Sequence, residues 1–499
     1  MRRILVSSLI AMFLSTSACI EERFLGTLQE CGNGSCEEGE SPSICPKDCL
    51  LHTCGNKICE AGEPTTCAAD CQATSCGDGV CDTGEDSFGC VEDCPWGVCG
   101  NFACEPGEDP ASCPEDCFPG FCGNGLCEDF ETSAGCPLDC APTRSADVLF
   151  VVDNSGSMAD EQAMLRDSFP ALLEAVRGSL GETPDLHVGV ISTDIGTSPH
   201  AITFCEGSGD DGRLQRGGAS LAGVPWMVDV APEGCAVQQG TDGQCASHSC
   251  GAAHCQHEPV TTLVEDAATG CPRCRNFPGA PAATFSDQAG LGIQGCGFEQ
   301  PLEALYRALD GHPENQGFLR EDAILAIVFL TDEDDCSARD PELFSTDSMT
   351  IDSVYGPLTS YRCFEFGITC DVNNRTQSGP RSQCTPREDP GAMLHPLSRY
   401  WSQIRSIKQP GQVLVAALAG PVANGQVVVG MDEYQQPALE ASCTSGSGGA
   451  APAIRLRTFA SAFNDAWALS VFGHSSICDD GYDLPMGELG AQLGRRLSF

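Results

Sequence analysis

Apolar residues in the carboxy-terminal part of the chain gather into short runs rich in valine, isoleucine and leucine. Four such runs lie at residues 147–153, 186–192, 323–330 and 412–420. Their length and their β-branched content are typical of strands that are buried on both faces of a sheet. We therefore predict that these runs form the central strands of a globular domain.

Segments with helical spacing lie between these runs. In residues 160–180, apolar side chains recur three or four positions apart, as they do on one face of a helix. The same spacing occurs in residues 301–309, in residues 400–407 and at Leu489, Leu493 and Leu497. Pro170 interrupts the first segment, so we expect a kink or a new helix start there, with Ser168 as its cap.

The alternation of strands and helices predicts an α/β fold. We expect a doubly wound, mostly parallel sheet with helices on both faces, because parallel strands need crossover connections that cover the sheet. In such sheets, ligands bind beyond the carboxyl ends of the strands. The residues that follow each predicted strand are therefore the first place to look for chemistry.

The amino-terminal part has a different pattern, in which a polar, cysteine-rich unit recurs. Residues 31–140 contain five copies with a period of 22 or 23 residues, and the first copy reads CGNGSCEEGESPSICPKDC. The segment has 20 cysteines and 22 acidic residues but only two lysines. A unit this small cannot bury enough surface to offset its chain entropy, so we expect two disulfides in each copy.

Oxygen-bearing residues recur at fixed positions in these repeats. In the first copy they are Asn33, Glu37, Glu40 and Asp48, and each has an equivalent in the other four copies. Three carboxylates and one amide carbonyl, or four carboxylates in the third copy, suit Ca²⁺, which takes six to eight oxygen ligands. The alternative is that the acids form a solvated face and that asparagine and glycine form tight turns.

The first residues of the chain have the layout of a secretory signal peptide. Arg2 and Arg3 precede an apolar run at residues 4–14, and small residues then lead to Cys19. The run is too short to span a bilayer, and no later stretch approaches ~20 apolar residues. We expect a signal peptide at residues 1–18, a lipid anchor on Cys19 and a linker at residues 19–30; simple cleavage after Ala18 is the alternative.

Charge and cysteine content narrow the classes of function. The chain has 26 basic and 70 acidic residues and a net charge of −44. This balance argues against a nucleic-acid binder, which needs clustered positive charge to neutralise phosphates. Its 35 cysteines indicate an oxidising compartment, because so many thiols would not stay reduced in an exported protein. The sequence has neither a His-Glu-x-x-His helix nor a Gly-x-Ser-x-Gly elbow, so we do not expect an enzyme.

A short linker at residues 141–146 leads into the larger domain at residues 147–499, in which we expect insertions at residues 196–290 and 336–395. The first insertion offers a set of zinc-ligating residue types, namely Cys245, His248, Cys250, His254 and Cys255. The domain has 14 cysteines, and an even count in an exported chain favours disulfides over zinc.

Hard oxygen donors follow two of the predicted strands. The first strand ends in the motif Asp153-x-Ser155-x-Ser157, and the third is followed by Asp332. The carboxyl ends of parallel strands lie at one edge of the sheet, so these groups are expected to meet there. Two carboxylates with hydroxyls and water suit Mg²⁺, and Mn²⁺ or Ca²⁺ would accept the same donors.

This Asp-x-Ser-x-Ser motif, with a Thr-Asp pair after a later strand, resembles the metal-ion-dependent adhesion site of von Willebrand factor type A domains. The resemblance implies that Asp153, Ser155, Ser157 and Asp332 are metal ligands. The family also uses a threonine from a later loop, but the corresponding segment here reads GCGFEQPLEAL and has none. Glu299 is the replacement we expect, with Gln300 or water as alternatives. Thr193-Asp194 after the second strand is another nearby candidate, but its position does not match that of the family threonine. The repeats resemble CGNGxCExGE arrays of exported myxobacterial proteins.

These observations together predict an exported binding or adhesion protein of the cell envelope, held as an outer-membrane lipoprotein or otherwise secreted. The expected partner is a protein whose exposed carboxylate fills an open position on the metal, with the membrane contacted through the lipid and not through a transmembrane helix. The alternative is an envelope scaffold in which the metal and the disulfides only stabilise the fold.

Overall fold

A computed structural model describes residues 144–497, except 241–242, 257–259, 348, 409, 423–425, 433, 447 and 464–475. The expected signal peptide, the lipidation site at Cys19 and the repeats with their calcium candidates Asn33, Glu37, Glu40 and Asp48 lie outside the described residues. The fold and the candidate site below concern the described residues alone.

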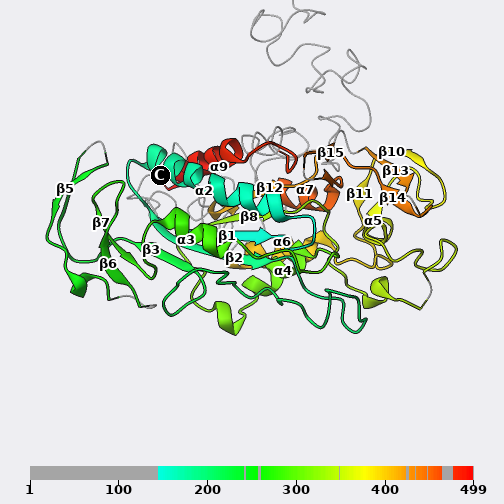
Figure 1. Ribbon diagram of the computed structural model, residues 1–499, viewed down its shortest axis with the longest axis horizontal. Coiled ribbons are helices and arrows are strands. Elements are labelled where there is room, and N and C mark those ends of the chain that lie inside the picture. Colours follow the sequence, from blue (N-terminus) through cyan, green and yellow to red (C-terminus); the bar gives the residue numbers. More distant parts are fainter. Residues whose placement is uncertain are drawn as a thin grey trace, which may run out of the picture. The chain divides into compact units, whose positions relative to one another are not determined.

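A seven-stranded sheet lies at the centre of this part, in the order β12-β8-β1-β2-β3-β7-β6 (Figure 1). Its first four strands are mutually parallel: β12 (Val413–Leu418), β8 (Ile324–Leu330), β1 (Ser145–Val152) and β2 (Asp185–Ser192). They coincide with the four predicted runs to within one or two residues. The mixed α/β class with a mostly parallel sheet is therefore confirmed.

Three further strands extend the sheet beyond β2 in an antiparallel sense. They are β3 (Met227–Val230), β7 (Pro272–Arg275) and β6 (Thr262–Glu265). All three come from residues 196–290, which the sequence indicated only as an insertion. This segment therefore supplies three strands of the central sheet.

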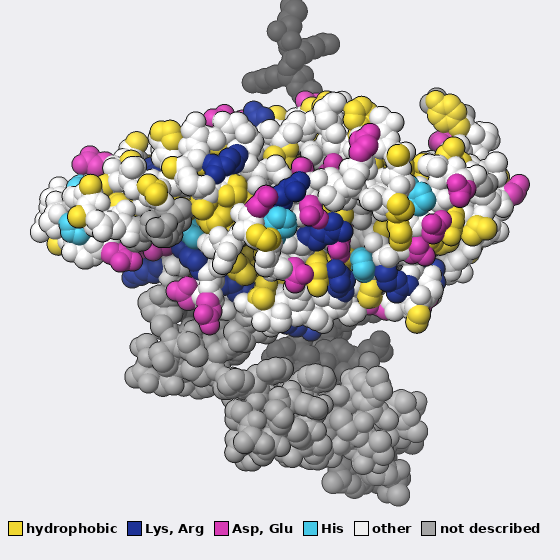
Figure 2. Space-filling view, turned by 90° about the horizontal axis from the view of Figure 1, so that it is seen from below, with side chains coloured by type: hydrophobic (Ala, Val, Ile, Leu, Met, Phe, Trp, Pro, Cys, Tyr) yellow, Lys and Arg dark blue, Asp and Glu magenta, His cyan; other side chains and the backbone are white. Residues whose placement is uncertain are grey.

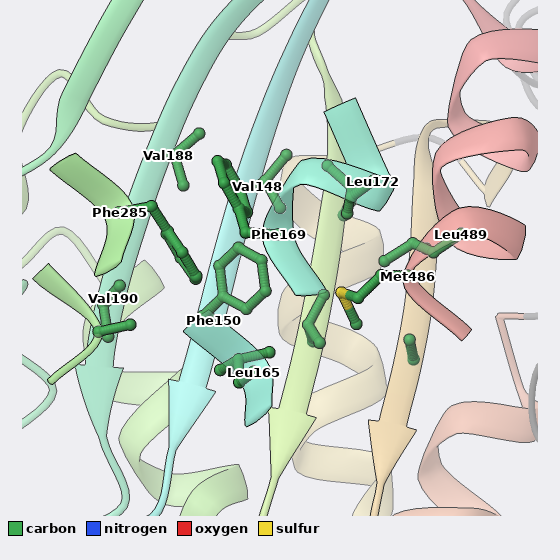
Figure 3. Close-up of a cluster of buried hydrophobic side chains, with 14 of the residues drawn as sticks. Val148, Phe150, Leu165, Phe169, Leu172, Val188, Val190, Phe285, Met486 and Leu489 are labelled. Carbon is green, nitrogen blue, oxygen red and sulfur yellow. The ribbon is translucent and has the colours of Figure 1, made fainter. Parts of the chain in front are cut away.

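Helices α2 (Ala159–Leu180), α3 (Pro281–Gln288) and α9 (Asp483–Arg496) pack on one face of the sheet (Figure 1). Their contact with it is centred on Phe150 of β1, Phe169 of α2 and Phe285 of α3 (Figure 3). The Phe169 and Phe285 rings are stacked with centroids 4.0 Å apart, and the Phe150 ring lies 4.6 Å from that of Phe285. Burial of such rings supplies a large share of the stability of a core.

The other face carries α4 (Pro301–Leu309), α6 (Leu397–Ile407) and α7 (Ile454–Ser461). Alternate residues of the strands point to this side, among them Leu149 and Val151 of β1, and both are fully buried. The strands are apolar on both sides because helices cover both sides, as their continuous hydrophobic runs predicted.

Helix α2 differs from the expectation in one respect. It runs without a break through Pro170, so the predicted restart at that residue is wrong. Ser168 is buried and does not cap a helix; its hydroxyl accepts a hydrogen bond from the backbone of Tyr482 at 3.2 Å. Packing of α2 against α9 and the sheet keeps the helix continuous although proline removes one of its hydrogen bonds.

All 14 cysteines from Cys205 onward are paired in disulfides, which confirms the expected pairing. The pairs are Cys205–Cys296, Cys235–Cys250, Cys245–Cys271, Cys255–Cys274, Cys336–Cys363, Cys370–Cys384 and Cys443–Cys478. The three cysteines of the alternative zinc set belong to three different disulfides, so that set is not available to a metal.

The remaining elements are short and lie in the connections. Antiparallel pairs or triplets are formed by β4 (Val237–Gln239) with β5 (Cys245–His248), β9 (Ile368–Thr369) with β11 (Thr385–Pro386), β15 (Cys443–Thr444) with β16 (Gly449–Ala450), and β10 (Gly379–Arg381) with β13 (Val427–Met431) and β14 (Pro437–Leu439). Helix α5 spans Tyr361–Gly367, and 3₁₀ turns lie at Ala252–His254, Pro313–Asn315, Pro341–Phe344 and Pro410–Gln412.

Two surface properties bear on what this part can contact. On the face shown in Figure 2, acidic and basic side chains are interspersed with apolar ones. Among the helices of the described residues, none combines the length and the apolar character needed to cross a bilayer.

Candidate metal site at the carboxyl edge of the sheet

The candidate site lies where β1, β2 and β8 end together. The register pairs Val152 of β1 with Ser192 of β2 and with Leu330 of β8. The next residues along the three strands are Asp153, Thr193 and Thr331, which therefore lie side by side at the carboxyl edge. The Thr331 hydroxyl donates a hydrogen bond to Asp153 Oδ2 at 2.8 Å, so at least these two side chains point the same way.

The two serines of the motif lie on a tight turn after Asp153. The backbone N–H of Ser155 donates to Asp153 Oδ1 at 2.8 Å, and the hydroxyl oxygens of Ser155 and Ser157 are 3.3 Å apart. The side chain of Gln162 in α2 donates to the carbonyl of Asp153 at 2.8 Å and so fixes the turn against the helix. The turn presents its hydroxyl pair next to the first carboxylate.

Asp332 joins this group from the neighbouring strand. A hydrogen bond from Ser157 favours its ionised form, yet burial and the nearby Glu161 carboxylate raise the pKa of Asp332. Its Oδ1 is buried and has no hydrogen-bond partner among the described residues. Burial, and then the Asp332 charge, raise the pKa of Asp153 to about 7. The structure therefore brings Asp153, Ser155, Ser157 and Asp332 together.

Glu299 approaches the same edge from the loop before α4, but it faces another carboxyl group. It is 2% exposed and hydrogen-bonded to Glu333, and its pKa is raised well above the ordinary value by burial and by the charges of Glu333 and Asp153. Burial likewise raises the pKa of Glu333 to about 7. Two carboxyl groups in contact, one of them fully buried, favour a shared proton, because ionising both would place two negative charges side by side.

Gln300, the other replacement considered for the threonine, is used by the fold. Its amide donates to the Gly196 carbonyl at 2.8 Å, and its Oε1 accepts from the backbone of Ala338 at 3.1 Å. Its own N–H donates to the carbonyl of Thr193 at 3.1 Å, which places the loop before α4 directly against the end of β2. Both the nitrogen and the oxygen of the Gln300 side chain are therefore engaged in contacts that hold the fold.

Thr193 is a further oxygen donor at this edge. The residue is fully buried, and its hydroxyl has no hydrogen-bond partner among the described residues. A buried hydroxyl without a partner costs free energy, so it calls for a ligand, a water molecule or a cation. Thr193 is not among the ligands predicted from the sequence, because its position does not match that of the family threonine.

A small cavity of about 60 Å³ opens beside Asp332. Ser157 and Glu161 line it from the turn and from α2, and residues 448–450 of the β15–β16 hairpin line its other side. The hairpin is held there by the disulfide Cys443–Cys478 and by a hydrogen bond from Ala451 N–H to the Asp332 carbonyl at 2.8 Å. The candidate site is thus partly covered by a cross-linked hairpin.

The other acids of the TDEDD segment have structural roles. Asp334 accepts hydrogen bonds from the backbone of Arg455 and Leu456 at the start of α7, and Asp335 pairs with the buried Arg455 side chain at 3.0 Å. By contrast, no Lys, Arg or His of the described residues forms an ion pair with Asp153, Asp332, Glu299 or Glu333. Buried carboxyl groups without a basic partner either take up a proton or coordinate a cation.

Carboxylates and hydroxyls are hard donors, so the residues present fit Mg²⁺, Mn²⁺ or Ca²⁺. Within the described residues, no three His, Cys, Asp or Glu side chains form a group that could hold a metal ion on their own. The candidate set differs from such a group because two of its four ligands are serine hydroxyls. A cation here would need water or a partner's oxygen to complete its shell.

Sequence reasoning found the four motif residues but not their supports. Thr331 and Gln162 hold Asp153 in place, and Glu161 adds a carboxylate beside Asp332. The signal for Thr331 was available, since the residue opposite Asp153 on a neighbouring parallel strand must lie beside it. The position of Glu161 beside Asp332 could not be predicted in this way, because the orientation of the first helical turn relative to the sheet depends on tertiary packing.

Comparisons with known proteins add little to this geometry. No protein-family model matches the chain, and no curated protein matches it. Among solved structures, the chain is similar to the pilus adhesin SpaC from Lactobacillus rhamnosus GG, with 12% sequence identity and a TM-score of 0.26. The match covers 71% of this chain and only 30% of that adhesin. This likeness is too slight to indicate a shared fold or function.

Proposed function

We propose that residues 147–499 form a doubly wound von Willebrand factor type A domain that binds a divalent cation at its carboxyl edge and uses it to bind a protein partner. The observation that carries this proposal is the convergence of Asp153 and Asp332 with the Ser155–Ser157 hydroxyl pair, while no basic side chain in the described part of the chain forms an ion pair with either carboxyl group. The central position of β1 between β2 and β8 supports it.

The metal proposed is Mg²⁺, with Mn²⁺ or Ca²⁺ as substitutes. Asp153, Ser155, Ser157 and Asp332 would hold it. Thr193, the residue after β2, would add a hydroxyl because its oxygen is buried and has no hydrogen-bond partner among the described residues. Glu299 would reach the metal only after leaving Glu333. A bound cation would attract the carboxylate of a partner to its open position.

The proposal extends to where the protein acts. The seven disulfides of the described part fit an oxidising compartment, in keeping with the signal peptide expected at residues 1–18. We infer an exported protein held at the outer membrane by a lipid on Cys19. The cysteine-rich repeats, with Ca²⁺ at the positions represented by Asn33, Glu37, Glu40 and Asp48, would form a spacer between the anchor and the binding domain.

Titration calorimetry on the full chain tests the metal site. Mg²⁺ and Mn²⁺ are added to the wild type, to Asp332→Asn and to Asp167→Asn, a matched change at an exposed position of α2. We expect one site in the wild type and in Asp167→Asn that is absent from Asp332→Asn. Equal binding by all three proteins, or no binding by any, would remove the metal from the proposal.

A scaffold role is the second candidate, and the hairpin over the site favours it. Residues 448–450 line the cavity beside Asp332, so a cation there would have less room for a partner's carboxylate. The two candidates differ in what the metal does. Capture of envelope proteins in Mg²⁺ that is lost in EDTA, with folding unchanged, supports adhesion; a fall in melting temperature in EDTA without any captured partner supports the scaffold.

A further inference from the structure

A second cavity lies far from the metal site along the strands, near the amino end of β2. Its volume is about 360 Å³, within the range of about 300 to 1,000 Å³ that small-molecule sites occupy. It is enclosed by the second half of α2, the start of α3 and the β6–β7 hairpin, on the left in Figure 1. Nothing in the proposed metal chemistry uses this cavity.

The walls of this cavity are largely apolar. Leu173 and Val176 line it from α2, Leu186 from β2 and Val264 from β6, with Ala282 at the start of α3. Three of the five are buried although they border a cavity. An apolar wall of this kind favours an apolar body, because water in such a space forms few hydrogen bonds.

The charges at the floor of the cavity are already paired. Arg275 donates to Asp229 at 2.9 Å and to Asp266 at 2.5 Å, and Arg273 donates to Asp229 at 2.6 Å. All four side chains are buried and hydrogen-bonded to one another, so they hold β3, β6 and β7 together. This network supports the fold of the cavity and offers no free charge to a ligand.

Arg177 at the edge of the cavity is different. Its Nε donates to the Leu173 carbonyl at 3.3 Å, and its Nη1 lies 3.9 Å from Asp266 Oδ1, too far for a strong pair. No other partner of this guanidinium is found in the part of the chain that the structure describes. Its side chain is 25% exposed, and a guanidinium has five N–H donors, so most of them remain available.

Helix α3 adds a weaker attraction for negative charge at the opposite wall. It begins at Pro281, and no side chain of the described residues caps it or places an acid in its first turn. Gly279 to Ala282 border the cavity, so the positive end of this short helix faces the same space as Arg177. The cavity thus combines apolar walls with two positive features at its rim, Arg177 and the start of α3. Glu265, the exposed carboxylate of its lining, lies 3.4 Å from His248 Nε2.

From this combination, we propose that the cavity binds a small amphipathic carboxylate, with the apolar body against Leu173 and Val176 and the carboxylate on Arg177. The proposal is independent of the metal site, because the two lie toward opposite ends of the strands. An anionic group without an apolar body, or an apolar body without the anion, should bind more weakly.

Octanoate is the probe. Octanol, which has a similar chain but no charge, and acetate, which has the charge but only a short chain, are the comparison compounds. Calorimetry on the full chain should show one octanoate site in the wild type, with octanol and acetate at least about tenfold weaker. Arg177→Gln keeps much of the side-chain stem and removes the charge, so it should weaken octanoate about tenfold and leave octanol unchanged.

Two more variants keep the test decisive. Ala268→Phe changes an exposed lining residue and should abolish octanoate binding by filling the cavity, while Arg405→Gln removes an exposed charge from α6 and should change nothing. The proposal is overturned if the wild type does not bind octanoate, if octanol binds equally well, or if binding survives in both Arg177→Gln and Ala268→Phe.

Discussion

Asp153 is the residue on which the candidate site depends, and its burial beside a second carboxyl group disfavours its ionised form. It is fully buried beside Asp332, and its pKa is raised to about 7 by burial and by that charge. Asp153→Asn keeps the shape and the hydrogen bond from Ser155 but removes one of two like charges. We expect this variant to lose Mg²⁺ binding while its metal-free form melts at or above the wild-type temperature.

Thermal melting in EDTA at pH 8, followed by Mg²⁺ titration, checks this prediction. Glu174→Gln, on an exposed position of α2, is the control for loss of a surface charge. A metal-free Asp153→Asn that melts well below the wild type would show that the carboxylate is needed for folding itself. In that case the burial of Asp153 would be structural.

His187 sets the expected response to acid. Burial, and then Arg320, lower its pKa to about 3, and its Nδ1 lies 2.7 Å from the Phe318 carbonyl. The folded state therefore keeps this ring neutral, whereas the unfolded chain protonates near pH 6.5. Its contribution to stability is present above pH 6.5 and is lost as the pH falls toward 3, by up to about 1.4 kcal/mol per pH unit.

Urea unfolding at pH 7.5 and pH 5 measures this effect. His187→Gln retains a donor for Phe318 but does not titrate, so it should lose less stability than the wild type between the two pH values. His248→Gln, in the peripheral β4–β5 pair, should behave as the wild type does. If His187→Gln loses as much stability between pH 7.5 and pH 5 as the wild type, the loss arises from other groups. These would be the buried carboxyls or His395, whose pKa is also lowered.

Most residues of the candidate site could be predicted from the sequence, but some could not. Asp153, Ser155, Ser157 and Asp332 converge because strand ends and a short turn are local features that the sequence shows. Thr193 was noticed but set aside, since its value depends on the register that places it beside Asp153. Whether a cation binds there remains a prediction.

The contact between α2 and α9 depends on two glycines in α9. A Cβ on Gly490 would lie 2.3 Å from the Leu172 carbonyl oxygen, and one on Gly494 would lie 2.6 Å from Ser179 Cβ. Gly487, one turn earlier, has open space around it. The backbones of the two helices can approach closely only where no side chain separates them.

Alanine at two of these positions should therefore have opposite effects. Gly490→Ala forces the helices apart and should destabilise the domain by about 1–3 kcal/mol, as overpacking does. Gly487→Ala improves helix propensity and should stabilise it by about 0.5–1 kcal/mol. Urea unfolding midpoints of the two variants decide the matter; a stabilising Gly490→Ala would mean that the helices are packed less closely.

At the scale of elements, the four parallel strands and the main helices could be predicted because their periods are strong. Strands β3, β6 and β7 could not, since their sequences MVDV, TLVE and PRCR are short and contain charged residues. Three of those charges, Asp229, Arg273 and Arg275, are buried in a network with Asp266, the residue after β6. These segments resemble loops in sequence, and they form strands because they pair with residues that are distant in the chain.

At the scale of the whole molecule, Cys205–Cys296 spans the longest segment among the disulfides of the described residues, with its cysteines 91 positions apart. It fastens the loop that leads to Glu299, whereas Cys370–Cys384 spans only 14 positions in a peripheral loop. Replacing both cysteines of the first pair by serine should lower stability by about 2–5 kcal/mol and weaken any metal binding. The same change in the second pair should cost less and leave the metal site intact.

Melting temperatures and Mg²⁺ titrations of the two double variants test this ranking. Chain-entropy arguments favour the longer loop, because cross-linking distant residues restricts the unfolded chain more. Equal losses in both variants would indicate that the cost lies in local packing around each pair. Intact metal binding without Cys205–Cys296 would show that the loop before α4 holds its place without it.

The position of β1 has a mechanical consequence. It is the first element of the described domain, and it is paired in parallel along its length with β2 on one side and β8 on the other. A pull between residue 144 and a ligand held at the opposite end of this strand would run along the strand axis. Such a force would load all the hydrogen bonds on both sides of β1 at once and would not break them one after another. We therefore expect the domain to resist tension in that direction.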